Sequence, residues 1–248
     1  MDLELAGRRA VVGASSQGLG FETARALAAE GVRVLLTGRD ADKLEEAVRE
    51  IGHGADGIVA DLSRVEGARA LVGAAIERLE TVDIVVLNVG GPPPGLAGST
   101  DLEELRRALD RCLLSMVELC QGFLPGMRER GWGRVLAITS GGVRQPLAGM
   151  VYSNASRAGL TGYLKTLARE VIADGVTVNS ILPSNQVTDR LRSLLGDGMD
   201  GYLESVPAGR GGRPRDFGRI AAFLCSESAN YLTGVSLSVD GGADPSLL

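Results

Sequence analysis

Short runs of apolar and β-branched residues alternate along the chain with longer segments in which apolar side chains recur at helical spacing. The run from Ile84 to Leu87 is apolar throughout, which is typical of a strand covered on both faces. In the longer segments, side chains such as Leu19, Leu27 and Ala28 form one apolar stripe. The pattern predicts strands at Arg9–Val12, Val32–Thr37, Gly57–Ala60, Asp83–Asn88, Arg134–Thr139, Val176–Leu182 and Val235–Val239.

The regular alternation of strand and helix predicts an α/β fold with a doubly wound parallel sheet of about seven strands, because parallel strands joined through helices make right-handed crossovers. No linker, repeat or low-complexity tract interrupts residues 1–248, so we expect one Rossmann-type domain. Ser63 with Glu66, and Thr100 with Glu103, have the spacing of capping boxes and predict helix starts. Pro214 suits the first turn of the last long helix.

Glycines and polar residues follow the predicted strands at their carboxyl ends. Carboxyl ends of parallel strands meet at one edge of a sheet, and a doubly wound sheet binds its ligand in the crevice there. We therefore expect one binding site at this edge. The six segments that would form it are Gly13–Gly20, Gly38–Arg39, Asp61, Asn88–Gly90, Thr139–Ser140 and Pro183–Ser184.

The first of these segments, Gly13–Gly20, has the composition of a phosphate-binding loop. Its glycines allow a tight turn and let the backbone come close to a pyrophosphate. The helix predicted to follow offers free N–H groups and the positive end of its dipole. The loop therefore favours a dinucleotide as the ligand.

Composition and charge narrow the classes of ligand and of catalytic or metal site that this protein can have. The net charge of −5 gives no general attraction to nucleic acid or to an anionic membrane surface. No apolar run is long enough to span a membrane, and the first residues lack the pattern of a signal peptide. Three scattered cysteines and one histidine, His53, fit no metal site, disulfide framework or histidine-based triad. We expect a cytoplasmic protein.

Over nearly its whole length the chain resembles the short-chain dehydrogenase/reductase family, and within that family it looks most similar to bacterial 3-oxoacyl-[acyl-carrier-protein] reductases. The matching segments are Ser15–Gly20, Asp61–Leu62, Asn88–Gly90, Ile138–Ser140, Val178–Asn179 before Pro183, Gly209–Arg210 and Val239–Gly242.

The resemblance implies an oxidoreductase that acts on a ketone or secondary alcohol, including a 3-oxoacyl thioester, with a nicotinamide cofactor. It also implies a homodimer or homotetramer, and a substrate lid at 188–209. The cofactor contacts that it implies are Gly13, Ser15, Ser16, Gln17, Gly18, Leu19, Gly20, Asp61, Leu62, Asn88, Val89, Gly90, Pro183 and Thr188.

The phosphate loop departs from the family motif, in which a Thr-Gly pair precedes Gly18 and Gly20. Those two positions hold Gly13 and Ala14. The first glycine of the motif is therefore either displaced by one residue or replaced by alanine. Because the two glycines at the helix start remain, we expect cofactor binding to survive.

The residues that transfer the proton in this family are altered as well. Its members use a serine, a tyrosine thirteen positions later and a lysine four further on, usually with a supporting asparagine. Ser140 fits the serine position, but Ser153 and Arg157 occupy the other two. Tyr152 is one residue early, which on a helix is a rotation of about 100°. Cys112 occupies the asparagine position.

A serine replaces that tyrosine poorly. The pKa of tyrosine is about 10, whereas that of a serine hydroxyl is closer to the roughly 15.7 of water. At about 1.36 kcal/mol per pKa unit the gap is roughly 8 kcal/mol, and arginine is itself a poor proton donor. Either Tyr152 reaches in through an irregular helix start, or water or a substrate group supplies the proton, or the protein is not a conventional reductase. We take Ser140, Tyr152, Ser153 and Arg157 as candidate catalytic residues, and Arg157 also as a cofactor contact.

The end of the second strand bears on the choice of cofactor. An acidic residue there accepts the ribose hydroxyls of NAD, but this chain has Gly38 followed by Arg39. A guanidinium can pair with the 2′-phosphate of NADP, and a hydrogen bond to a charged group contributes about 1.5–3 kcal/mol. We therefore expect NADP(H).

Three functions are open at this point. The first is an NADP(H)-dependent oxidoreductase with an altered proton donor. The second is a dehydratase or isomerase on the same scaffold, in which Ser140 polarises a carbonyl. The third is a regulatory protein that binds NADP without turnover.

Overall fold

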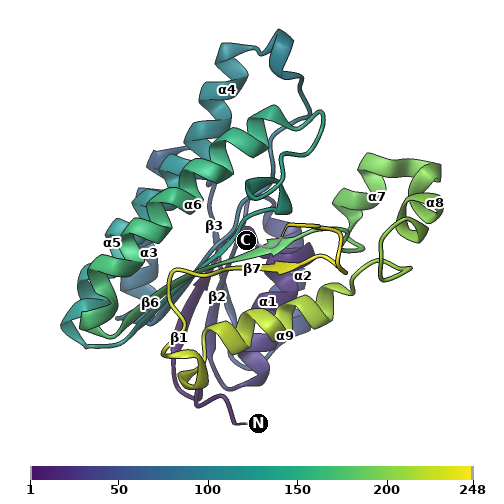
Figure 1. Cartoon of the computed structure of the whole chain (residues 1–248). Coiled ribbons are helices and arrows are strands. Elements are labelled where there is room, and N and C mark those ends of the chain that lie inside the picture. The colour runs from purple at the N-terminus through teal and green to yellow at the C-terminus, as the bar shows by residue number, and fades with distance from the viewer. Residues whose placement is uncertain (1, 247–248) are drawn as a thin grey trace.

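The computed structural model describes residues 2–246 and contains a seven-stranded sheet with every pair of neighbours parallel (Figure 1). The strand order is β3-β2-β1-β4-β5-β6-β7, which confirms the predicted doubly wound sheet. The observed strands begin and end within one or two residues of the predicted bounds. They are β1 (Arg9–Val12), β2 (Arg33–Gly38), β3 (Asp56–Val59), β4 (Ile84–Leu87), β5 (Gly133–Ile138), β6 (Val176–Pro183) and β7 (Ser236–Val239).

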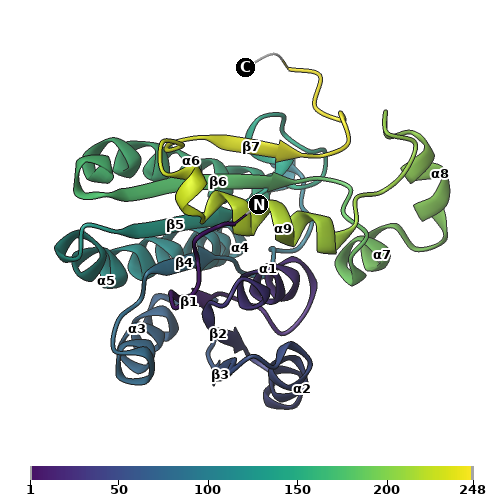
Figure 2. The same ribbon diagram turned by 90° about the horizontal axis from the view of Figure 1, so that it is seen from below.

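Helices cover both faces of the sheet, as the view in Figure 2 shows, with α3, α5 and α6 on one side and α1, α2 and α9 on the other. The helices are α1 (Gly18–Ala29), α2 (Ala41–Ile51), α3 (Val65–Leu79), α4 (Leu102–Leu109), α5 (Ser115–Glu129), α6 (Val151–Val171), α7 (Asp189–Leu195), α8 (Met199–Glu204) and α9 (Pro214–Leu224). Pro214 begins α9, as predicted.

Alternate residues of the inner strands β1, β2, β4 and β5 pack into two separate cores. In β1, Val11 packs into the core with α3, α5 and α6, whereas Ala10 and Val12 pack into the core with α1, α2 and α9. This arrangement requires apolar residues at successive positions, which explains why an inner strand such as β4 is a continuous apolar run.

Both predicted capping boxes are wrong, because Asp101 caps α4 in place of Thr100, and α3 begins without a side-chain cap. Before α4, the carboxylate of Asp101 accepts the N–H groups of Glu103 at 2.8 Å and Glu104 at 3.4 Å, while Thr100 closes the preceding turn. Before α3, the carboxylate of Asp61 accepts the N–H of Ser63 at 3.0 Å, and the helix begins only after Arg64.

The strand order reverses between β1 and β4, so the loops that follow these two strands diverge and leave a crevice at the carboxyl edge. The short helices α7 and α8, within the expected lid region, project from the layered body beside this edge (Figures 1 and 2). Within residues 2–246, no helix combines the length and the apolar character needed to cross a bilayer.

Candidate functional site

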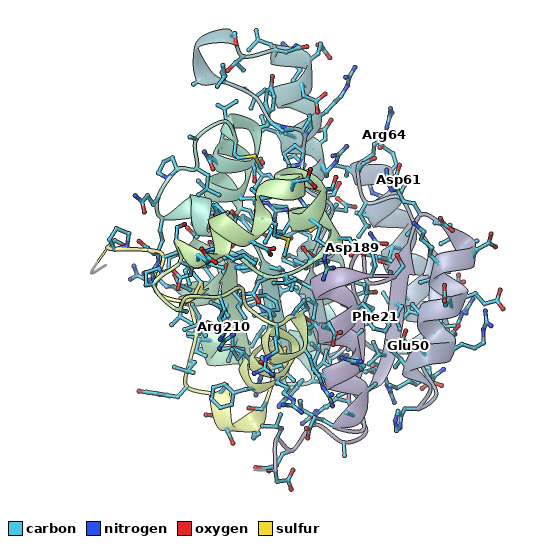
Figure 3. The ribbon with its side chains drawn as sticks, turned by 90° about the vertical axis from the view of Figure 1, so that its right-hand side faces the viewer. Phe21, Glu50, Asp61, Arg64, Asp189 and Arg210 are labelled. Carbon is cyan, nitrogen blue, oxygen red and sulfur yellow. The ribbon has the colours of Figure 1, made fainter. Side chains whose placement is uncertain are left out.

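A cavity of about 670 Å³ opens at the carboxyl edge of the sheet. It collects residues that follow β1 to β6, together with residues of α6 and α7. Asp61 after β3 and Asp189 at the start of α7, both labelled in Figure 3, line this cavity from different elements. The predicted convergence of strand ends is therefore present.

The phosphate loop between β1 and α1 is held from both sides. The side-chain amide of Asn88 donates to the carbonyl oxygens of Gly13 at 3.0 Å and Ala14 at 3.1 Å. The hydroxyl of Thr37 accepts from the Ala14 N–H at 2.9 Å. Ser15 is buried and donates to the Val12 carbonyl at 2.8 Å. Asn88 and Ser15 thus shape the loop.

Ala14 occupies the left-handed position of the loop, with a φ of +43°. A left-handed φ is the conformation that glycine adopts most readily, which favours replacement of the motif's first glycine by Ala14 over its displacement to Gly13. Gly20 could not be replaced by alanine without a clash, since a Cβ there would lie 2.6 Å from the carbonyl oxygen of Ala14. The glycine at the helix start is therefore required by close packing.

The end of the cavity near β2 and β3 carries two cations, Arg39 and Lys43, beside Asp61. Partial burial raises the pKa of Asp61, but hydrogen bonds from Ser63 and the positive charges of Arg39 and Arg111 outweigh this effect, so the pKa lies below its ordinary value. Asp61 therefore remains a carboxylate at neutral pH.

Three of the four candidate catalytic residues meet in the cavity. Ser140 lies two residues after β5, and its hydroxyl accepts the Gly142 N–H at 3.1 Å. Ser153 and Arg157 lie one helical turn apart on α6, and Ser153 makes no side-chain hydrogen bond within the described chain. The guanidinium of Arg157 is buried and donates to the carbonyl oxygens of Ile138 at 3.0 Å and Val89 at 3.3 Å.

The structure does not bring Tyr152 into this group. Its hydroxyl accepts the N–H of Asp101 at 3.0 Å, and its ring packs so closely on Gly95 that a Cβ at that glycine would lie 2.3 Å from it. The side chain is buried and does not line the cavity. Helix α6 begins regularly at Val151, so one residue of offset turns Tyr152 away from Ser153, and its candidacy as the acid is withdrawn.

Cys112, at the position of the supporting asparagine, lies in a π-helical turn over Asp110–Leu114 between α4 and α5. It is fully buried in the core and does not line the cavity. Its neighbour Arg111 does line the cavity.

The remaining sequence-predicted residues divide into two groups. Gly13, Ser15 and Gly20 do not line the cavity, and they act on the shape of the loop instead. The lining includes Ser16, Gln17, Gly18, Leu19, Arg39, Asp61, Leu62, Asn88, Val89, Gly90, Pro183 and Thr188.

Sequence reasoning missed four residues that bear on the site. Thr37 holds the loop, and Lys43, Arg111 and Arg190 add positive charge to the lining. Lys43 could have been found, since it lies in the first turn of α2, four residues after Arg39. Arg111 and Arg190 had no signal in the sequence, because they reach the cavity from the π-helical turn and from α7.

These features fit a dinucleotide phosphate. No side chain caps the start of α1, so the first N–H groups of this helix are left to a ligand. Gly18, with a φ of +66°, begins the helix at the cavity wall. At the end of β5, the hydroxyl of Thr139 is buried without a partner in the described chain, which leaves a hydrogen bond for a bound group.

A family model, sequence relatives and solved structures all match this chain to the same family of proteins. Residues 13–244 match the family model described as enoyl-(acyl carrier protein) reductase. The 3-oxoacyl-[acyl-carrier-protein] reductase of Vibrio cholerae serotype O1 is 32% identical over 240 residues, which is 97% of this chain and 98% of that protein.

Solved structures of similar proteins identify the same family. L-sorbose reductase from Gluconobacter frateurii, in complex with NADPH and L-sorbose, superposes with a TM-score of 0.92 at 33% identity and covers all of both chains. A 7α-hydroxysteroid dehydrogenase with NADH and 7-oxo glycochenodeoxycholic acid superposes with a TM-score of 0.91 at 30% identity, over 100% of this chain and 98% of that one. The chain belongs to the short-chain dehydrogenase/reductase family.

Proposed function

We propose that this protein is an NADP(H)-dependent oxidoreductase that interconverts a ketone and the corresponding secondary alcohol. The observation that carries the proposal is one cavity that joins the phosphate loop and Arg39 to Ser140, Ser153 and Arg157. A bound nicotinamide cofactor supplies or accepts the hydride in such a reaction. The protein has to hold that cofactor, orient the carbonyl and manage a proton.

Cofactor choice follows from the cations at the end of β2. Arg39 and Lys43 suit the 2′-phosphate of NADP, and Gly38 leaves no carboxylate at the strand end to accept ribose hydroxyls. The next carboxylate, that of Asp40, is engaged as the N-cap of α2 and accepts the Lys43 N–H at 3.2 Å. The solved relatives include complexes with NADPH and with NADH, so the support for NADP(H) comes from these residues.

Carbonyl chemistry falls to Ser140, Ser153 and Arg157. The two serine hydroxyls can donate hydrogen bonds to a carbonyl oxygen, and the permanent charge of Arg157 favours negative charge developing there. Among the described residues of the lining there is no tyrosine, histidine, cysteine or glutamate. We therefore assign the proton to water that reaches the carbonyl oxygen beside the serine hydroxyls.

The test is oxidation of NADPH in the presence of a panel of ketones that includes a 3-oxoacyl thioester, the substrate class named for the relatives in bacteria. We expect turnover with at least one ketone, a preference for NADPH over NADH, and a loss in kcat/KM of ten-fold or more in Ser140→Ala, Ser153→Ala or both. NADPH binding without turnover on any ketone would contradict the proposal.

The absence of a tyrosine, histidine, cysteine or glutamate from the described lining also favours a second candidate, a regulatory protein that binds NADP(H) without turnover. In that case NADPH binds tightly, no ketone is reduced, and the serine variants bind NADPH as the parent does. A dehydratase or isomerase would instead form product without consuming cofactor, which product analysis detects.

We also propose a cellular compartment and an oligomeric state for the protein. The three cysteines are buried and unpaired within residues 2–246, which suits a reducing cytoplasm. We propose a homo-oligomer, a dimer or tetramer, and light scattering at several protein concentrations would measure its mass. A monomer at all of them would contradict this part.

A further inference from the structure

Three arginines meet where the loop after β4 faces α6 and α7. Arg157 donates to the Val89 carbonyl at 3.3 Å. Arg190 donates to the carbonyls of Gly91 at 3.5 Å and Pro92 at 3.1 Å. Arg111 also donates to Gly91, at 3.4 Å. One short loop thus orients three guanidinium groups that come from three different elements.

None of the three has a carboxylate within ion-pair distance in the described part of the chain. Their partners are carbonyl oxygens, which satisfy donors but carry no net charge. The carboxylate nearest in sequence to Arg190 is that of Asp189, and it pairs with Arg192 at 2.9 Å. Burial lowers the pKa of Arg190, and the charges of Arg157 and Arg111 lower it further.

The net charge of the cavity lining is therefore positive, whereas the net charge of the whole protein is negative. The lining holds five cationic side chains, Arg39, Lys43, Arg111, Arg157 and Arg190, against the three carboxylates of Asp40, Asp61 and Asp189. The whole chain has a net charge of −5. Like charges that crowd in a half-buried site raise the free energy of the empty protein, and an anionic ligand relieves this cost.

The cofactor does not account for all of this charge. Arg39 and Lys43 lie with β2 and α2, at the end assigned to the 2′-phosphate, and the start of α1 faces the pyrophosphate. Arg111 is partly balanced by Asp61, whose pKa it lowers. This leaves Arg190 without an assigned anionic partner. It lies on α7, next to Leu191, in the part of the lining that a substrate would contact.

We propose that the substrate is a small oxo acid whose carboxylate binds Arg190, with its carbonyl group at Ser140 and Ser153. This inference rests on the proposed function and narrows it to one class of ketone. A guanidinium fork matches a carboxylate in two parallel hydrogen bonds. Arg157 and Arg111 add positive potential, and Leu191 and Leu194 offer apolar contact to the rest of a small acid.

The test compares acids with their neutral methyl esters, which keep the ketone and remove the negative charge. Pyruvate and levulinate, each with its methyl ester, place the carboxylate at two distances from the carbonyl. Binding is measured by calorimetry to the protein saturated with NADP⁺ and to the cofactor-free protein, and kcat/KM is measured with NADPH. We expect at least one acid to bind roughly ten-fold or more tightly than its ester.

Arg190→Met should remove this advantage of the acid and leave the affinities for the esters and for NADPH within about two-fold of the parent, whereas Arg190→Lys should keep part of it. The matched control is Arg215→Met, on α9 and with the same loss of charge, which should keep the preference for the acid because Arg215 is exposed and does not line the cavity.

Equal binding of acid and ester by the parent overturns the inference. So does an Arg190→Met variant that loses as much affinity for NADPH as for the acid, because Arg190 would then be a ligand of the cofactor phosphates. Turnover of esters and neutral ketones without any preference for acids refutes this inference and leaves the proposed reductase intact. Absence of all turnover refutes the reductase, while the binding measurements still decide whether the cavity selects a carboxylate.

Discussion

Ala14→Gly is expected to stabilise the protein, although the same substitution usually does the opposite. Ala14 has a φ of +43°, in the left-handed region, where an L-residue with a Cβ costs about 1–2 kcal/mol. Hydrogen bonds from Asn88 to the Ala14 carbonyl and from the Ala14 N–H to Thr37 impose this conformation. Glycine relieves the strain but gives the unfolded chain extra entropy of about 0.5–1 kcal/mol.

The net expectation is a gain of roughly 0.5–1 kcal/mol in the free energy of unfolding. For a chain of this length that corresponds to a rise in Tm of roughly 1–4 °C. The measurement is urea denaturation followed by far-UV circular dichroism, with thermal scans at one fixed rate. NADPH affinity should not fall, because the loop keeps its conformation.

The matched control is Ala70→Gly, at an exposed position inside α3, where glycine should cost about 1 kcal/mol. Opposite signs for the two variants would establish that the strain at Ala14 exists. If Ala14→Gly lowers the stability as Ala70→Gly does, then the loop is not strained at this residue and the assignment of Ala14 to the glycine position of the motif is wrong.

Three further outcomes are expected. Arg39→Ala should raise the Kd for NADPH about ten-fold or more and change that for NADH little; equal losses for both cofactors in fluorescence titration would remove Arg39 from the 2′-phosphate site. Tyr152→Phe should keep its turnover and lower the Tm slightly, because only the Asp101 N–H loses an acceptor; abolished turnover with unchanged NADPH affinity would restore Tyr152 as the acid. Burial raises the pKa of Cys120 and Cys225 to about 12, so these thiols should stay protonated and unreactive toward Ellman's reagent at about pH 8 until the protein is denatured; rapid modification of either thiol in the native protein would contradict that.

The fold and most of the cavity could be predicted from the sequence because both depend on simple periodicities. A strand buried on both faces has to be an apolar run, as Ile84–Leu87 is, and its carboxyl end has to meet its neighbours at one edge. Any polar residue that follows such a run, for example Asn88 or Ser140, is therefore placed near the others before any coordinates are known.

Details that depend on which of two neighbouring side chains makes a given hydrogen bond could not be predicted. Thr100 and Asp101 are both good helix caps, and only the geometry of the turn shows that the carboxylate caps the helix while the hydroxyl closes the preceding turn. The π-helical turn at Asp110–Leu114 breaks the 3.6-residue period without any glycine or proline to announce it. The residues of this turn therefore do not keep the face that a regular helix would give them, and Arg111 lines the cavity without a signal in the sequence.

Arg157 shows how the altered positions depend on one another. In the family, the lysine at this position has two tasks, to hold the cofactor ribose and to tune a tyrosine. The guanidinium here donates to two backbone carbonyls, at Ile138 and Val89, so it suits binding and electrostatics rather than the tuning of an acid. With Ser153 beside it there is no phenol to tune. A lysine would gain nothing from such a neighbour, whereas an arginine adds to the positive potential that Arg190 and Arg111 create. The two replacements are therefore consistent with one change, from a site built around a titrating acid to a site built around fixed positive charge.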